Sequence, residues 1–257
     1  MLYILANSMC HPAHCEINFL LTLLCILYTI YKEKMMTFLS KIHPISLRDQ
    51  VVQQIRTSII EGQINRNDHI TESILTKQLG VSRTPVREAL ILLEQEGLVV
   101  SAANRRCYVR AFSERDVSEI FSMRTTLENM AGKIVIHELS EGDFAYLHKS
   151  IASQRVAIEL GDFKQVRTID MAFHEYLVKK SHHELLIRNW LAIVAQIAAV
   201  LYLRAESIEG YDEYQSLHDH TSIVEAYQAR DLAQLMALNE QINLRVAQEC
   251  QRGIASS

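Results

Sequence analysis

Residues 80–90, GVSRTPVREAL, constrain the fold of this chain more than any other segment. A glycine ends one short helical pattern, and Ser82 follows where the cap of a new helix is expected. Pro85 then falls in the first turn of that helix, where its missing N–H costs no hydrogen bond. Arg83 and Arg87 are four residues apart, so they share a face near the exposed start of the helix. A helix whose N-terminal end enters the major groove of DNA has this arrangement.

The surrounding pattern predicts a small domain over residues 46–112. Apolar residues at helical spacing predict three helices, from Leu47 to Gly62, from the expected cap Thr71 to Leu79, and over 84–95. Two short apolar runs, 98–100 and 107–110, are separated by a polar break and predict a hairpin. This order of elements is that of a winged helix-turn-helix. The residues expected to face inward are Ile74, Leu75 and Leu79 on the second helix and Val86, Leu90 and Leu93 on the third.

Residues 113–252 show helical patterns with no strand pattern between them. Ser113 is expected to cap a long helix that runs to about Leu139. Trp190 and Tyr202 fall at core-like positions and are assigned to packing. The predicted fold class is therefore mainly α: an N-terminal winged helix-turn-helix with a small β-hairpin wing, then an all-α helical bundle. The remaining helices are expected at 141–160, 162–181, 183–208, 213–229 and 231–252.

The composition fits two globular domains and excludes several other classes of protein. The chain has 257 residues, of which 49% are hydrophobic and 22% charged, and it contains only eight Gly and three Pro. Residues 46–112 carry slightly more Lys and Arg than Asp and Glu, whereas residues 113–257 are acidic. A mildly basic head suits a partner that carries phosphates. The five cysteines form no CxxC pair, which argues against disulfide scaffolds and zinc fingers and favours a reducing cytoplasm.

The apolar run at residues 17–31, INFLLTLLCILYTIY, raises the question of a membrane. It is shorter than the roughly 18 to 20 residues of a spanning helix, and it lacks the basic start and cleavage site of a signal peptide. We treat residues 1–45 as an N-terminal extension, expect translation to begin at Met35 or Met36, and expect no membrane partner. A non-spanning apolar tail and a short anchor are the alternatives; an anchor would make this a membrane-tethered protein.

The segment GVSRTPVREAL, with Glu72 on the preceding helix, resembles the GntR family of bacterial transcriptional regulators. The helical second domain is similar to that of the FadR-like branch, whose C-terminal FCD domain binds a ligand. The resemblance covers roughly residues 46–250. It implies a homodimer that binds a palindromic operator in double-stranded DNA and is released or retuned by a small carboxylate-type metabolite. We expect a repressor, although the sequence leaves repression and activation both open.

By this resemblance, Arg83, Thr84 and Arg87 take the positions that contact operator bases and phosphates. The chemistry agrees, because an arginine fork can bind guanine through two hydrogen bonds. The hydroxyls of Ser82 and Thr84 can donate to phosphate at a helix start, where the helix dipole also helps. The alternative is that Arg83 and Arg87 form only a solvated helix face.

Two positions depart from the pattern of the family. Ser73 stands where many relatives have an arginine, and Arg106, beside Arg105, stands where many have a glycine at the wing tip. One cation is therefore missing from the second helix while two lie on the wing. We expect Arg105 and Arg106 to contact DNA, with contact shifted toward the minor groove beside the wing.

Asp170 and His174 are four residues apart on a predicted helix and so point from one face. His220 lies on a later predicted helix. By the resemblance, these three match the first three ligands of metal-binding FCD domains. There an Asp and three His hold a divalent ion such as zinc or nickel, and the effector's carboxylate docks against the ion. The fourth His is expected about 22 residues after His220, where this chain has Ile242 and Asn243.

The incomplete ligand set leaves several interpretations open. Three ligands can hold an ion whose shell is completed by water or effector. In the second interpretation, Asp170 and His174 form a buried hydrogen-bonded pair and the pocket takes an organic ligand without metal. An enzyme built on the cluster is disfavoured, because no carboxylate stands as general base in an HExxH-type motif. Candidates for a substitute fourth ligand are His182, His183 and His218.

Arg124, with Leu127 and Glu128, matches a family motif on the first helix of the bundle. An arginine is always charged, so Arg124 facing the cavity would suit a carboxylate effector. An ion pair with Glu128, at the surface or between the domains, is the other interpretation.

Overall fold

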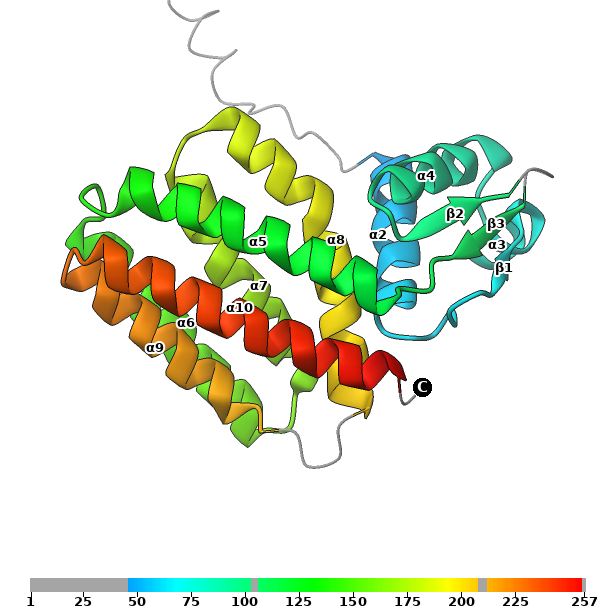
Figure 1. Ribbon diagram of the computed structural model, residues 1–257. Helices are drawn as coiled ribbons and strands as arrows, with labels where there is room; N and C mark the ends of the chain where they lie inside the picture. Colours follow the sequence, from blue (N-terminus) through cyan, green and yellow to red (C-terminus); the bar gives the residue numbers. More distant parts are fainter. Residues whose placement is uncertain (1–45, 103–105, 208–211, 256–257) are drawn as a thin grey trace, which may run out of the picture. The chain divides into compact units, whose positions relative to one another are not determined.

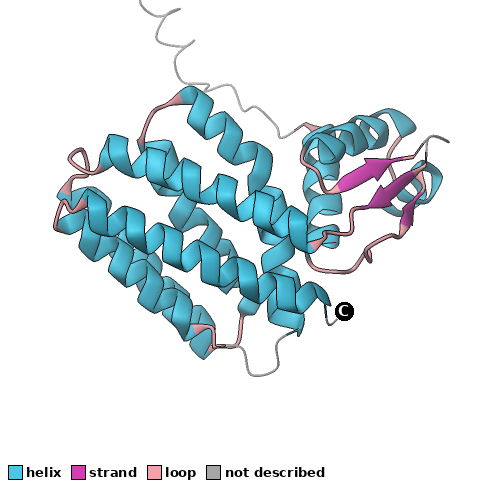
Figure 2. Ribbon diagram, in the orientation of Figure 1, coloured by secondary structure: helices cyan, strands magenta, loops and turns pink. Residues whose placement is uncertain are grey.

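The computed structural model describes residues 46–102, 106–207 and 212–255, and these are mainly helical with one small sheet (Figures 1 and 2). The predicted fold class is confirmed, because a winged helix-turn-helix precedes an all-α bundle. The apolar run at 17–31 and Arg105 of the wing lie outside the described residues.

The N-terminal domain is organised around α4, which buries one apolar stripe. Val86, Leu90 and Leu93 are buried as predicted. Gly80 ends α3 with a φ of 65°, a left-handed conformation that glycine adopts without a Cβ clash. The prediction for Ile74 is wrong: its side chain is 53% exposed, because the short α3 buries only Leu75. The helices of this domain are α2 (Leu47–Ile60), α3 (Glu72–Leu79) and α4 (Arg83–Gln95).

Ser82 and Thr71 occupy the N-cap positions predicted for them, but neither side chain makes a capping hydrogen bond. For Ser82 the neighbouring proline supplies a reason. An N-cap oxygen accepts from the N–H of the second or third helical residue, and the third residue of α4 is Pro85, which has no N–H. The Ser82 hydroxyl consequently stays exposed at the start of α4.

A three-stranded antiparallel sheet completes the domain, with strand order β1-β3-β2. The predicted hairpin is formed by β2 (Val99–Ser101) and β3 (Cys107–Val109), in a register that pairs Val100 with Tyr108. The sequence did not predict β1 (His69–Ile70), which adds to the other edge of β3. Two residues are too few to show the alternation by which strands are recognised.

The helices of the second domain pack with α5 beside α10 and α6 beside both α7 and α9 (Figure 1). One apolar cluster lies among these helices and includes Leu147, Phe173 and Tyr227. The first helix ends at Val135, not at about Leu139 as predicted, and a turn follows. The bounds are α5 (Glu114–Val135), α6 (Glu141–Glu159), α7 (Phe163–Lys180), α8 (Glu184–Ser207), α9 (Tyr214–Gln228) and α10 (Leu232–Ala255).

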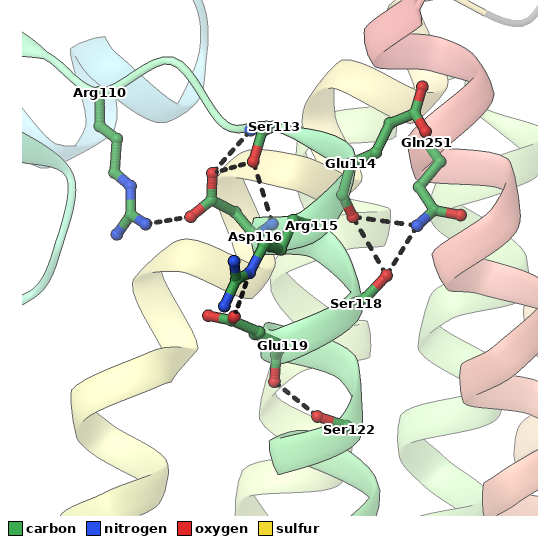
Figure 3. A network of polar contacts seen from close by, with 9 residues as sticks. All are labelled: Arg110, Ser113, Glu114, Arg115, Asp116, Ser118, Glu119, Ser122 and Gln251. Carbon is green, nitrogen blue, oxygen red and sulfur yellow. Dashed lines mark hydrogen bonds and ion pairs between the residues drawn. The ribbon is translucent and has the colours of Figure 1, made fainter.

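The start of α5 is fixed by a capping box, which confirms Ser113 as its cap (Figure 3). The Asp116 N–H donates to the Ser113 hydroxyl oxygen, and the Asp116 carboxylate accepts from the Ser113 N–H. The same carboxylate accepts from Arg110, which follows β3. Gln251 of α10 donates to the Glu114 carbonyl oxygen at 3.0 Å, so the end of α10 is tied to the same turn.

The segment Glu184–Arg204 of α8 is long and apolar enough to cross a membrane by length and composition, with a mean hydropathy of 1.7. In this fold part of the segment packs into the core, where Ile197 and Val200 are buried, whereas Leu191 is exposed. Trp190 is also fully buried, as predicted. Tyr202 is only partly buried: it lies against Gly62, and its ring lies beneath the guanidinium of Arg167 at 5.0 Å.

Asp143 provides a test of how much a buried capping carboxylate stabilises this bundle. It closes the capping box of α6 with Ser140 and also accepts from Tyr176 and Lys180. Burial alone would raise its pKa, but the hydrogen bonds of Lys180, Ser140 and Tyr176 lower the pKa overall. We expect Asp143→Asn to lower the free energy of unfolding by about 1.5–3 kcal/mol at pH 7, measured by urea denaturation.

The pH dependence has a defined sign. Because the pKa of Asp143 is lowered in the folded protein, its contribution is complete above the ordinary aspartate pKa of about 3.9 and is lost as the pH falls below that value. The difference between the two proteins should therefore stay constant from pH 7 down to about pH 4 and shrink below that pH. Asp162→Asn is the matched control, since Asp162 caps α7 through one hydrogen bond to the Gln165 N–H and asparagine caps equally well. A difference that grows with acid would contradict this account.

Candidate functional site

Three polar side chains predicted as metal ligands do meet inside the bundle. Asp170 and His174 lie one turn apart on α7, and His220 comes from α9. The Nε2 atoms of the two histidines are 3.2 Å apart, and Asp170 Oδ1 is 3.3 Å from His220 Nε2. One ligand atom from each residue lies within 4.8 Å of the other two. The two ligands from α7 and the one from α9 thus converge on one point.

His174 is held from behind by Glu128 of α5. Its Nδ1 atom is 2.9 Å from Glu128 Oε1, which also accepts from Arg124 Nε at 2.9 Å. The other carboxylate oxygen accepts from the Asn243 side-chain amide at 2.8 Å. Asp170 and His174 therefore do not pair with each other, as one interpretation of the sequence had it. They pair with His220 and Glu128 respectively.

The electrostatics keep both carboxylates of this cluster ionised. Burial opposes ionisation of Glu128, but the charge of Arg124 and the hydrogen bonds from His174 and Asn243 lower its pKa to about 2. Burial likewise opposes ionisation of Asp170, and the hydrogen bond and charge of His220 prevail and lower its pKa. Burial and the charge of Arg124 lower the pKa of His174, so its imidazole is neutral at pH 7. A neutral imidazole is the form that binds metals.

The three residues fit a divalent metal by chemistry and by spacing. Carboxylate oxygen and imidazole nitrogen are ordinary ligands of zinc and related ions. Two atoms bound to a tetrahedral zinc at about 2.0–2.1 Å lie about 3.3 Å apart, close to the two shorter separations between ligand atoms given above. The Nδ1 of His174 faces the carboxylate of Glu128, and such a second partner orients a metal-binding histidine and raises its basicity.

Neither residue at the expected fourth position contributes a ligand atom. Ile242 is apolar and lines the space beside the three ligands. Asn243 points to Glu128 instead. Among the described residues, no proposed substitute joins the group: His182 and His218 are exposed, and His183 Nδ1 accepts from the Leu186 N–H at the start of α8. The structure thus brings Asp170, His174 and His220 together, and their role as metal ligands stays a prediction.

The space beside the cluster is small. It has a volume of about 30 Å³, more than the roughly 10–15 Å³ that one water molecule needs but far below the roughly 300 Å³ of a small ligand pocket. Arg124 lines it, so this arginine faces the predicted cavity and also forms an ion pair with Glu128, buried rather than at the surface. An organic acid would fit only after neighbouring side chains had moved. Other lining residues are Leu201, Arg204, Ile242 and Val246.

A second, more open hollow of about 670 Å³ lies away from the cluster. It runs along α7 and α2 and is lined by Lys164 and Arg167 among others. Lys164 is already paired with Glu61 at 2.6 Å, and Arg167 lies over the Tyr202 ring. We place the ligand centre at the smaller space, because the convergent buried charges and histidines are there.

The start of α4 presents the predicted DNA-contact residues to solvent. Ser82, Arg83, Thr84 and Arg87 are all exposed, and so is Arg106 on the wing. Arg87 donates two hydrogen bonds to Glu72 of α3, at 3.1 and 3.3 Å. The hydrogen bond and charge of Glu72 raise the pKa of Arg87, and the paired carboxylate holds the guanidinium in one direction.

Residues 47–109 match the family model of the bacterial regulatory proteins of the gntR family, and residues 119–243 match that of the FCD domain. The chain belongs to the GntR family. The two matched regions cover the helix-turn-helix with its wing and most of the helical bundle. The chain is therefore a DNA-binding transcriptional regulator with an FCD effector-binding domain, not an enzyme.

Individual relatives agree with this assignment. The transcriptional regulator YdhC of Bacillus subtilis is 33% identical over 135 residues, which is 52% of this chain and 60% of YdhC. The gluconate operon transcriptional repressor of Bacillus licheniformis is 26% identical over 71% of this chain and 76% of its own length. Among solved structures, Escherichia coli McbR/YncC has a TM-score of 0.69 at 23% identity, covering 79% of this chain and 95% of McbR. That likeness supports the fold.

Sequence reasoning missed two partners in the ligand centre. The sequence pattern pairs Glu128 only with Arg124, whereas Glu128 also contacts His174. At Asn243 the sequence shows only the absence of a fourth histidine, whereas the Asn243 amide donates to Glu128. The spacing of Arg124 and Glu128 was a usable signal; for Asn243, 115 residues away from Glu128, there was none.

The buried pair on α5 can be compared with an exposed pair on the same helix. The side chains of Arg124 and Glu128 are 4% and 7% exposed, whereas those of Arg115 and Glu119 are 88% and 64% exposed at the same i, i+4 spacing. Glu128→Gln keeps the shape and removes the charge, so it leaves a buried arginine without its partner. We expect it to lower the free energy of unfolding by about 3–5 kcal/mol.

Urea denaturation measures both variants. Glu119→Gln should leave the stability essentially unchanged, because exposed pairs contribute little. Equal losses for the two variants would contradict the buried role of Glu128.

Proposed function

We propose that the protein is a homodimeric cytoplasmic repressor that binds a palindromic operator and is controlled by a small carboxylate-type metabolite. The observation that carries the proposal is the exposed, doubly cationic start of α4, with Arg83 and Arg87 one turn apart. The relatives of this chain that are named as operon repressors support repression over activation. We take 46–112 as the DNA-binding domain, 113–252 as the effector and dimerisation domain, and 1–45 as an extension.

Each residue at the start of α4 has a defined contact in this proposal. Arg83 and Arg87 bind base edges, with Arg87 held in place by Glu72. Ser82 and Thr84 bind phosphate, and the lack of a capping bond leaves the Ser82 hydroxyl available for that contact. Arg106 on the wing contacts the flanking groove together with Arg105. In a dimer, the two α4 helices meet half-sites about one helical turn apart.

The ligand centre takes a divalent ion of the zinc or nickel type on Asp170, His174 and His220, and the effector carboxylate completes its shell. The three converging donors and the buried Arg124 support this assignment. Such an ion would supply positive charge and an open position for a carboxylate. Since the present space holds about 30 Å³, binding of the acid must move its walls.

Arg110 connects the DNA-binding domain to the two helices, α5 and α8, that line this space. Arg124 on α5 and Leu201 on α8 both line the space. Arg110, just after β3, donates to Asp116 at the start of α5 and, at 3.3 Å, to Gln196 of α8 (Figure 3 draws the first contact). A shift of α5 against α8 would therefore change the support of the wing, and with it the spacing of the two α4 helices.

Arg87→Ala tests the DNA contact. It should weaken binding to the operator by about tenfold or more, because a bidentate contact to a base is lost. The measurement is a mobility-shift titration with the DNA upstream of the protein's own gene, where footprinting first locates the operator. Arg115→Ala is the control, since Arg115 is also exposed and also paired with a glutamate. Unchanged operator affinity in a dimeric Arg87→Ala protein would rule out the contact.

His174→Ala tests the metal. Elemental analysis and a zinc titration by calorimetry should give about one ion per wild-type chain and at least a 100-fold loss of affinity in the variant, more than is typical for losing a ligand's outer partner. His148→Ala removes an exposed histidine from α6 and should change nothing. A metal-free protein that still responds to its effector would favour a purely organic pocket.

A further inference from the structure

A chain of buried hydrogen bonds runs behind His220, on the side away from the other ligands. His220 Nδ1 is 2.8 Å from Oε1 of Gln154, a residue of α6. Both side chains are buried, with 2% and 0% exposure. Gln154 Nε2 donates to Ser216 Oγ at 3.0 Å, and Ser216 Oγ donates to the Glu213 carbonyl oxygen at 2.8 Å.

The donors and acceptors in this chain fix its direction. Ser216 has one hydroxyl hydrogen, which the Glu213 carbonyl takes, so the Ser216 oxygen must accept from the amide N–H of Gln154. The carbonyl oxygen of Gln154 then faces His220. An amide oxygen can only accept, and His220 must therefore present Nδ1–H to it.

This direction determines which nitrogen of His220 can bind an ion. With the Nδ1 proton held by Gln154, Nε2 is the only nitrogen of His220 that can bind an ion, and the ion displaces the proton that Nε2 shares with Asp170 in the ion-free protein. That Nε2 is the atom that faces Nε2 of His174 and Oδ1 of Asp170. Glu128 accepts Nδ1–H from His174 in the same way. The carboxylate of Glu128 and the amide oxygen of Gln154 thus each accept a proton from Nδ1, and the Nε2 atoms of both histidines face the proposed ion site.

We propose that Gln154 is a positioning residue of the ligand centre: oriented by Ser216 and the Glu213 carbonyl, it holds His220 as the Nδ1–H tautomer and so makes Nε2 available to a divalent metal ion. The inference rests on the metal function proposed above. Gln154 touches neither the ion nor the effector in this role; it acts through His220.

The same two helices supply a control for a purely structural role. Gln228 of α9 and His148 of α6 also form a Gln–His hydrogen bond between α6 and α9, at 3.3 Å, but on the surface. If Gln154 served only to join the two helices, its loss would resemble the loss of Gln228. If it sets the tautomer, only its loss affects the binding of metal.

The first experiment titrates zinc into the full-length, metal-free protein, with a chromophoric chelator as competitor. Gln154→Leu should bind zinc about 10- to 100-fold more weakly than wild type, the usual effect of removing a ligand's outer partner. Gln154→Glu should bind at least as well as wild type, because a carboxylate also accepts Nδ1–H. Gln228→Leu should match wild type. Thermal melting of each metal-free variant checks that it is folded.

The outcomes separate the two proposals. Zinc affinity of Gln154→Leu within threefold of a wild type that binds zinc would overturn the role of Gln154 alone. A wild type that binds neither zinc nor nickel would overturn the metal centre, and the role of Gln154 with it. A second readout needs no metal: ¹⁵N spectra of histidine-labelled, metal-free protein should show Nδ1 of His220 protonated in wild type and the Nε2–H form gaining population in Gln154→Leu. An Nε2–H tautomer in wild type would overturn the proposal.

Discussion

The carboxylate of Glu128 is the interaction on which the rest of the helical domain depends. It accepts from Arg124 on its own helix, from His174 on α7 and from Asn243 on α10. A buried charge is costly unless it is paired and its remaining oxygen positions are satisfied. Here three donors meet that requirement, and each comes from a different helix. The arrangement therefore fixes α5, α7 and α10 relative to one another and orients a candidate metal ligand at the same time.

That dual role links stability to function in this domain. Arg124 lines the small space beside the cluster while it is bound to Glu128. A carboxylate entering this space would compete with Glu128 for the arginine, and any change in that pair bears on His174 and on the helix that carries both charges. The other end of α5 holds Arg110 through Asp116 (Figure 3). The helix thus has a buried ionic contact in its middle and an ionic contact to the winged domain at its start.

Much of the fold followed from local pattern, and the exceptions have physical causes. The helices, the hairpin and the cap at Ser113 are set by residues close in sequence, so periodicity and capping rules predicted them. The capping bond of Ser82 did not form, since Pro85 removes one of its two possible donors. Strand β1 was too short to show a pattern. Within the site, the i, i+4 rule placed Asp170 beside His174, but the partners of His174 and His220 lie 46 or more residues away along the chain. Periodicity and capping rules relate residues only a few positions apart, so they cannot predict these contacts.

The two histidines differ in what stands behind them, and this difference bears on how the centre would work. His174 faces a carboxylate and His220 a neutral amide, so the pair adds one negative charge, to which Asp170 adds a second. The buried Arg124 offsets one of these two negative charges, so a divalent ion held here would leave an excess of positive charge that a carboxylate effector could balance. The apolar Ile242 and the guanidinium-bearing Arg124 both line the space beside the three ligands. An incoming carboxylate would then be attracted both by the ion and by Arg124, and because it competes with Glu128 for the arginine, the Arg124–Glu128 pair is a contact that the effector must disturb.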